Sequence, residues 1–205
     1  MRLFAFLRPC FLSAALLLSA GNAQAEELKD FVVTLTVLPV HYGINQLKVN
    51  GVDAVIVRGR FDNGNAWGGD IYTVLVKEKD SEAWRIVRHE QDTSMSAVLT
   101  STSPHTGEDS IRTIRFMTAK DGGLYLLEAA REYKPDVQKT QASFTLSAVQ
   151  TDPDFGVPYF HKLSKTQPPS LYCNVEAALR HELNIPLPDD GIDYAVCETL
   201  GKAEK

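Results

Sequence analysis

The residues best suited to chemistry lie in one glycine-rich stretch, residues 58–72, which combines two arginines, two asparagines, two aspartates and three aromatic residues. Arg58 and Arg60 are two positions apart, so their side chains share one face if the stretch is a strand. Two guanidinium groups on one face can hold a carboxylate through paired hydrogen bonds. We therefore predict a binding site for a small carboxylate-bearing ligand. Its expected residues are Arg58, Arg60, Asn63, Asn65, Trp67 and Asp70.

A plainer interpretation of the same stretch stays open. Alternate charged residues are also typical of the solvent-facing side of a strand, and pairs such as Asn63-Gly64 are common in turns. Trp67 can equally be an anchor in the core or at its rim instead of a surface for a ligand. The sequence alone does not decide between a binding site and an ordinary strand and turn.

The sequence lacks the motifs of the common exported hydrolases. It contains no Gly-x-Ser-x-Gly and no Ser-x-x-Lys, which carry the nucleophilic serine in two large enzyme classes. Its five histidines are isolated, with no His-x-His and no His-Glu-x-x-His for a metal. We therefore expect no catalytic residues, no metal and no cofactor. A pair of carboxylates brought together by the fold, as in glycosidases, stays open.

Residues 1–25 have the pattern of a secretory signal peptide. Arg2 and Arg8 flank the start, an apolar run follows at 10–20, and Ala23-Gln24-Ala25 matches the small-x-small site of signal peptidase. The run is shorter than the roughly 20 residues that a membrane-spanning helix needs. We expect cleavage before Glu26, a mature chain in the periplasm and no membrane contact afterwards. Loss of the two arginines changes the net charge from −5 to −7, which disfavours a nucleic-acid partner.

Two cysteines remain after the signal peptide, Cys173 and Cys197. Because an exported chain meets an oxidising compartment, an even pair predicts a disulfide. Closing a loop of this length would stabilise the fold by roughly 3 kcal/mol. A metal-bound or catalytic pair of thiols is the weaker alternative, since no histidine lies beside either cysteine at ligand spacing.

The pattern of residues 30–150 predicts a mainly β fold. Residues 31–38 alternate, with Phe31, Val33, Leu35 and Val37 on one face, which indicates a half-buried strand. Runs rich in Val, Ile, Thr and aromatic residues predict further strands at 52–60, 71–77, 83–88, 110–118, 124–133 and 142–150. Glycine and asparagine predict turns at 62–65 and 121–123. The expected architecture is an antiparallel sheet, sandwich or barrel-like, with one short C-terminal helix.

The remaining segments complete the predicted organisation. Residues 94–109 are expected to form a long loop, which is either mobile or functional. Four prolines predict an extended, irregular segment over residues 152–170, and Asn174 is a predicted N-cap for a helix that ends near Leu183. We therefore divide the chain into a signal peptide (1–25), an antiparallel β domain (26–151) and a proline-rich segment with the helix and a disulfide-tied tail (152–205), packed on the same domain.

Several short motifs follow one another in an order that resembles a known family. They are Ile44-Asn-Gln-Leu-Lys-Val-Asn-Gly51, Val55-Ile-Val-Arg-Gly-Arg60, Asn63-Gly-Asn-Ala66 before Ile71-Tyr-Thr-Val74, and Tyr172-Cys-Asn-Val-Glu-Ala-Ala178 before Glu182-Leu183. Over residues 30–185 the chain thereby resembles the exported carbapenem intrinsic-resistance proteins of the CarG type. The resemblance implies protection of a cell against a carbapenem in the periplasm, without hydrolysis of the drug.

Two functions from different classes follow. The first is non-hydrolytic protection, in which the protein sequesters the carbapenem, whose carboxylate suits Arg58 and Arg60, or shields the targets of the drug. The alternative is an exported β-rich adaptor or inhibitor of another protein, with no antibiotic role, whose interface includes Trp67, Tyr72 and the loop at 94–109. A concave site would favour the small molecule, and a flat apolar patch would favour the protein partner. An enzyme of unfamiliar chemistry is a third option.

Overall fold

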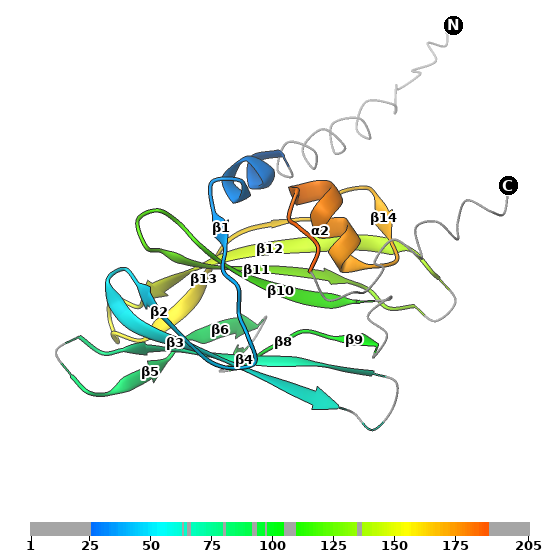
Figure 1. Ribbon diagram of the computed structural model, residues 1–205. Coiled ribbons are helices and arrows are strands. Elements are labelled where there is room, and N and C mark those ends of the chain that lie inside the picture. Colours follow the sequence, from blue (N-terminus) through cyan, green and yellow to red (C-terminus); the bar gives the residue numbers. More distant parts are fainter. Residues whose placement is uncertain are drawn as a thin grey trace, which may run out of the picture.

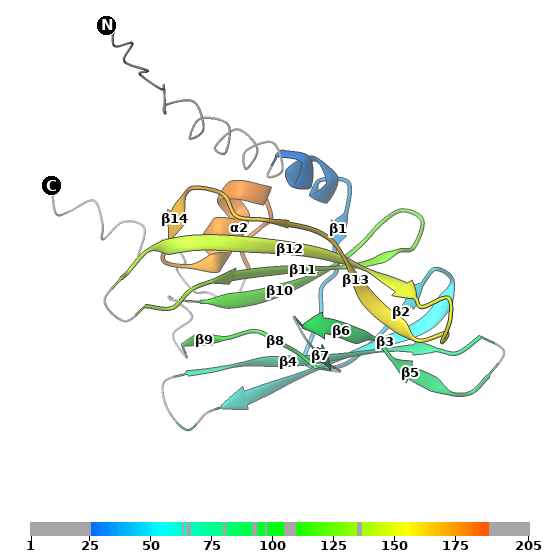
Figure 2. The ribbon, with the colours of Figure 1, turned by 180° about the vertical axis from the view of Figure 1, so that it is seen from behind.

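Two stacked β-sheets and a helical layer make up the part of the chain that the computed structural model describes (Figures 1 and 2). That part is residues 26–188 except 63, 65–66, 80, 92–93, 97, 105–109 and 135–136. For the strand residues 67, 90–91, 94–96 and 103–104, only the backbone is described. The two sheets do not close into a barrel, so the predicted β fold is a sandwich with helices on one outer face.

The smaller sheet has six strands and forms the lower layer in Figure 1. Its strands are β2 (Gly43–Val49), β3 (Val52–Asp62), β4 (Trp67–Lys77), β5 (Trp84–Ile86), β8 (Leu99–Thr100) and β9 (Ser103–Pro104). The first four pair in the order β2-β3-β4-β5, and β8 and β9 both pair with β4. All these pairings are antiparallel, as expected for strands joined by short turns.

The larger sheet has eight strands and forms the middle layer. They are β1 (Thr36–Val37), β6 (Arg88–Gln91), β7 (Ser94–Ser96), β10 (Arg112–Thr118), β11 (Leu124–Arg131), β12 (Thr140–Thr151), β13 (Pro158–Thr166) and β14 (Leu171–Tyr172). The order is β1-β10-β11-β12-β13-β6-β7, with β14 on β12. Among the strand pairs described in this sheet, β13 and β6 run parallel and the others run antiparallel. The predicted turn at 121–123 joins β10 to β11, with Gly122 at a φ of 87°.

The larger sheet contributes to two hydrophobic cores because its side chains alternate between its faces. In β11, Leu124 and Leu126 pack between the two sheets, whereas Leu127 and Ala129 pack toward the helices. All four are buried. Burying a leucine contributes about 1.5–3 kcal/mol, so this strand is a main source of stability for both layers.

The predicted C-terminal helix is confirmed as α2 (Val175–Leu183), which lies on the outer face of the larger sheet (Figure 1). The side chain of Asn174 accepts a hydrogen bond from the Glu176 N–H at 2.8 Å and so caps the first turn. The helix ends at Leu183, and the residue that caps it, Asn184, has a left-handed φ of 57°. Its buried apolar residues are Val175, Ala178, Leu179 and Leu183. No helix in the described part of the chain is long and apolar enough to span a membrane.

The predicted strand at 31–38 is wrong over its first half. Residues 26–32 are helical, and β1 covers only Thr36–Val37. Leu28 and Val32 are both buried in the core beneath the helices, whereas Phe31 and Val33 are exposed. Positions 28 and 32 are about one helical turn apart, so a helix can bury both residues on one face. A strand that buried Phe31 and every second residue after it would leave both positions on the exposed face.

Two segments predicted to be irregular contain strands. Residues 158–166 form β13, an inner strand of the larger sheet, so the prediction of an irregular segment is wrong there. Pro158 is the first residue of this strand, a position at which proline is tolerated because its missing N–H disturbs the ladder least. Residues 94–104 include the short strands β7, β8 and β9, and residues 105–109 lie outside the described part of the chain.

Candidate functional site

At one end of the sandwich the inward-facing positions of three strands change from apolar to polar or charged. These inward rows are Ala54, Ile56, Arg58 and Arg60 in β3, Val74, Tyr72 and Asp70 in β4, and Phe116, Ile114 and Arg112 in β10. The rows of β3 and β4 are in register, since Arg58 pairs with Tyr72 and Arg60 pairs with Asp70. At this end the sheets enclose a pocket of about 790 Å³, a size typical of small-molecule sites.

The lining of this pocket is rich in arginine. It includes the four arginines Arg58, Arg60, Arg112 and Arg115 and two carboxylates, Asp70 and Glu176. Apolar side chains from residues 37–40, from Phe116 and from residues 186–188 form a further part of its wall. Each of the four arginines has a carboxylate partner, and a guanidinium has further N–H groups that can donate to an additional anion. The lining therefore suits an anion that also carries apolar groups.

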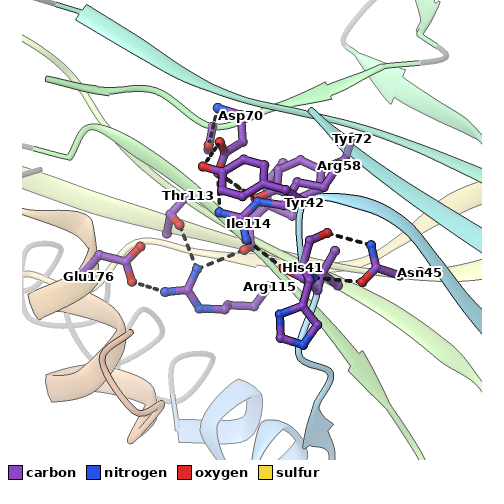
Figure 3. A network of polar contacts seen from close by, with 12 residues as sticks. His41, Tyr42, Asn45, Arg58, Asp70, Tyr72, Thr113, Ile114, Arg115 and Glu176 are labelled. Atoms are coloured by element: carbon purple, nitrogen blue, oxygen red, sulfur yellow. Dashed lines mark hydrogen bonds and ion pairs between the residues drawn. The ribbon is translucent and has the colours of Figure 1, made fainter. Parts of the chain in front are cut away.

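Asp70 lies at the centre of a network of hydrogen bonds (Figure 3). Arg58 donates to its Oδ2 from Nε at 3.1 Å and from Nη2 at 2.6 Å, and Tyr42 donates to its Oδ1 at 2.9 Å. Tyr72 donates to Oδ2 at 3.3 Å. Arg58 also donates to the Val40 carbonyl at 2.7 Å and stacks 4.3 Å from the centre of the Tyr42 ring. The network fastens residues 40–42 to β3 and β4.

The pKa values of Tyr42, Tyr72 and Arg58 in this network are all raised. Burial raises the pKa of Tyr72 to about 12, an effect that Arg58 opposes and Asp70 strengthens. Burial and the hydrogen bond to Asp70 raise the pKa of Tyr42 as well. Burial lowers the pKa of Arg58, but Tyr72 and Asp70 raise it, and the net change is upward. Both phenols therefore stay protonated as donors, and Arg58 stays charged.

A second ion pair joins the pocket to the helical layer. Arg115 of β10 donates to Glu176 in the first turn of α2, and its other amino group donates to Thr113 Oγ1 at 2.9 Å and to the Ile114 carbonyl at 3.0 Å (Figure 3). A carboxylate near the N-terminus of a helix is stabilised by the helix dipole. The pair thus holds the first turn of α2 to β10.

The fourth lining arginine belongs to a buried chain of charges. Arg112 donates to Glu128 at 2.7 Å, and the other oxygen of Glu128 lies 2.8 Å from Nε2 of His89. Burial raises the pKa of Glu128, but its hydrogen bonds to His89 and Arg112 outweigh burial and hold that pKa below its usual value. Glu128 therefore stays ionised and keeps Arg112 in place. Among the described residues, no cluster of His, Cys, Asp and Glu could hold a metal ion.

The structure brings together three of the six residues predicted for the site. Arg58, Arg60 and Asp70 line the pocket. Asn63 and Asn65 lie outside the described residues, and for Trp67 the backbone alone is placed, paired with Pro104 of β9. Arg58 and Arg60 do share a face, but it is the inner face of the sandwich and not the solvent side. Asp70 is the partner of Arg58, so Arg60 offers the more exposed guanidinium of the two. The binding role of all six stays a prediction.

Four residues of the pocket were missed in the sequence, namely Tyr42, Arg112, Arg115 and Glu176. Arg112 carried a usable signal, because it continues the alternating row of Phe116 and Ile114 and is therefore a charged residue at an inward position. The other three lie together only because separate elements meet, and no local pattern marks them.

The predicted disulfide can be tested by mass. Cys173 is fully buried just before α2, and its predicted partner, Cys197, lies outside the described residues. We expect the unreduced mature chain to weigh about 2 Da less than the reduced chain, because a disulfide removes two hydrogens. A Cys197→Ser variant is the control and should show no change of mass on reduction. Rapid alkylation of two thiols in the unreduced native protein would contradict the pairing.

Comparison with known proteins gives a likeness in fold. No protein-family model matches the sequence, and no curated protein is similar to it. Among solved structures, the crystal structure of CarG superposes with a TM-score of 0.59 and 17% sequence identity, over 77% of this chain and 98% of that one. At this identity the likeness concerns the fold alone. The chain has a CarG-like fold.

Proposed function

We propose that this protein is an exported periplasmic protein that protects a cell against a carbapenem without hydrolysing it. The observation that carries the proposal is the arginine-lined pocket at the open end of a CarG-like sandwich. A carbapenem carries a carboxylate on a compact ring system, and a pocket of about 790 Å³ with four arginines and apolar walls suits such a molecule. The sequence lacks the Ser-x-x-Lys motif of lactam-cleaving serine enzymes.

Arg60 is the residue whose loss should weaken drug binding most without disturbing the fold. Its guanidinium is half exposed, and its contact with Asp62 is long, at 3.7 Å. Removing one charge-assisted contact to a carboxylate weakens affinity by about ten-fold or more. Arg88→Glu is the matched control, because Arg88 is also an exposed strand arginine but lies outside the pocket lining.

The test is survival of a susceptible Gram-negative host that expresses the full chain. We expect growth in a carbapenem at concentrations that kill the vector control, no effect on an unrelated penicillin, and unchanged drug in the medium. Arg60→Glu should abolish the protection, and Arg88→Glu should keep it. Loss of the drug would mean an enzyme, and protection that survives Arg60→Glu would exclude the pocket as the site of sequestration.

A second candidate function is favoured by a different surface, the outward face of the smaller sheet. By strand register this face carries five exposed apolar side chains, Ile44, Val57, Ile71, Trp84 and Ile86. Ile44 is 72% exposed. Figures 1 and 2 place no described element beyond this sheet. An exposed apolar patch of this kind is typical of a protein-binding surface. A protein that shields the targets of the drug would need such a surface, and so would an adaptor with no antibiotic role.

Substitutions on that face separate the two modes. Ile44→Lys and Val57→Lys place charges on the face and leave the pocket lining unchanged. If the protein sequesters the drug, both variants should protect as well as the wild type. If protection is lost while the purified variants still bind the carbapenem, the protein shields a target instead. Absence of protection by the wild type against either drug would favour the adaptor.

A further inference from the structure

We propose that the pocket receives the C-terminal end of an extended peptide, which pairs with the edge of β10 at Ile114 and places its carboxylate on Arg60. This inference rests on the pocket of the proposed function and names a second class of ligand for it. A β-lactam with a carboxylate presents an amide carbonyl and an anion, which are also the groups at the end of a peptide. Both ligands would then compete for one site.

The first observation is an opening in the edge of β10. On that edge, Leu38 donates its N–H to the Phe116 carbonyl at 2.8 Å, and Thr102 exchanges backbone hydrogen bonds of 2.9 and 3.2 Å with Arg112. Alternate residues of a strand direct their peptide groups to the same edge. The N–H of Ile114 is therefore directed to this edge as well, between its two neighbouring partner segments, where Ile114 lines the pocket.

The Ile114 peptide has one group to offer an incoming chain. Its carbonyl already accepts a hydrogen bond from Arg115 at 3.0 Å, as Figure 3 shows. The Ile114 N–H is the group that remains, and it can donate a hydrogen bond to a carbonyl oxygen of an extended ligand. Strand addition at a sheet edge uses such main-chain contacts for affinity and adjacent pockets for selectivity. Between the described partner segments at Leu38 and Thr102, the opening spans a single residue of this edge, so it suits the last residues of a peptide and not a long strand.

The second observation is an exposed guanidinium in the same pocket. Of the four lining arginines, Arg60 has the most exposed side chain, at 56%, against 33% for Arg112 and 26% for Arg58. Arg58 and Arg112 are held by Asp70 and Glu128, respectively. Arg60 also has a carboxylate partner, Asp62, at 3.7 Å, but its side chain is the most exposed of the four and is therefore the best placed to meet a ligand carboxylate.

The apolar part of the pocket completes the argument for a peptide. Val40, Phe116 and Leu187 line it together with three prolines. These side chains suit small apolar residues next to the terminal carboxylate, whereas an inorganic anion would gain nothing from them. The pocket thus combines a backbone donor on a strand edge, an exposed guanidinium and an apolar wall. This combination matches the C-terminus of a peptide better than a simple anion.

The test is binding of short peptides to the purified protein by calorimetry, with acetyl-Ala-Ala, its C-terminal amide and acetate as probes. We expect the free peptide to bind at least about ten-fold more tightly than the amide, since the amide lacks the charge that Arg60 would hold. Acetate should bind more weakly than the peptide. Arg60→Gln should remove the preference for the free carboxylate, whereas Arg88→Gln should keep it. The amide proton resonance of Ile114 should shift on peptide binding.

Each result of this test decides a separate point. Equal affinity for the peptide and its amide, acetate binding as tightly as the peptide, or an unmoved Ile114 resonance would each overturn the inference. If a carbapenem binds and protects while the peptide does not bind, the inference fails and the proposed function stands. If the peptide binds as expected while no carbapenem protection occurs, the proposed function fails and the inference stands.

Discussion

Replacing Arg58 with alanine is expected to lower the free energy of unfolding by about 3 kcal/mol, because the variant leaves the Asp70 carboxylate without its cationic partner. The side chain of Asp70 is only 15% exposed, so water cannot replace the two lost hydrogen bonds well. The variant also loses the contact to the Val40 carbonyl and the stacking on Tyr42. Urea denaturation at neutral pH, followed by circular dichroism, measures the change.

A second substitution tests whether the loss of stability comes from the unpaired Asp70 carboxylate or from other lost contacts of Arg58. Asp70→Asn removes the carboxylate, so Arg58→Ala combined with Asp70→Asn should be less destabilised than the sum of the two single variants. Arg60→Ala is the matched control for stability and should change the free energy of unfolding by less than about 0.5 kcal/mol, since its side chain is half exposed. An Arg58→Ala variant as stable as the control would show that the Asp70 network adds nothing to stability.

As the pH rises from 10 to 12, deprotonation of Tyr72 alone should lower the free energy of unfolding by about 2–3 kcal/mol. Burial raises the pKa of this phenol to about 12 in the folded state, above its ordinary value of 10.0. Between these values the unfolded chain releases the proton and the folded chain keeps it. The contribution is therefore complete below pH 10 and disappears as the pH rises through 12.

The contribution of Tyr72 is measured as a difference, because other side chains also titrate in this range. Tyr72→Phe should flatten the alkaline loss of stability, whereas Tyr133→Phe, which changes an exposed tyrosine, should leave it as in the wild type. The readout is the urea midpoint at pH 9, 10, 11 and 12. Identical slopes for the wild type and Tyr72→Phe would contradict the buried, protonated phenol.

Local patterns in the sequence predicted those parts of the fold in which neighbouring residues decide the structure. Asn174, followed by an apolar stripe, predicted α2 because cap and stripe both lie within a few residues of one another. Most of the β-rich runs became strands for the same reason. The helix at residues 26–32 was missed because the alternation of Phe31, Val33, Leu35 and Val37 indicates a strand, whereas Leu28 and Val32 are buried by elements far away in the sequence.

The candidate site could be predicted only in part because it is assembled from distant elements. Arg58 and Arg60 were placed on a shared face by strand alternation, and the structure confirms that placement. The sequence could not show whether that face is the inner or the outer face of the sheet. The pattern of charged residues along one strand is the same in both cases until the position of the second sheet is known. Tyr42 joins the pocket through a hydrogen bond to Asp70, 28 positions away. Arg115 and Glu176 join it through an ion pair that spans 61 positions.

The order of the strands also bears on how the chain folds. Strands β2 to β5 follow one another along the chain, and so do β10 to β13. Each group can therefore form through hairpins of low contact order, with little loop-closure entropy to overcome. The slower event is then the docking of the two groups, which buries the core between them. The walls of the pocket come from both groups, so a bound ligand would bridge them and shift the equilibrium toward the docked chain.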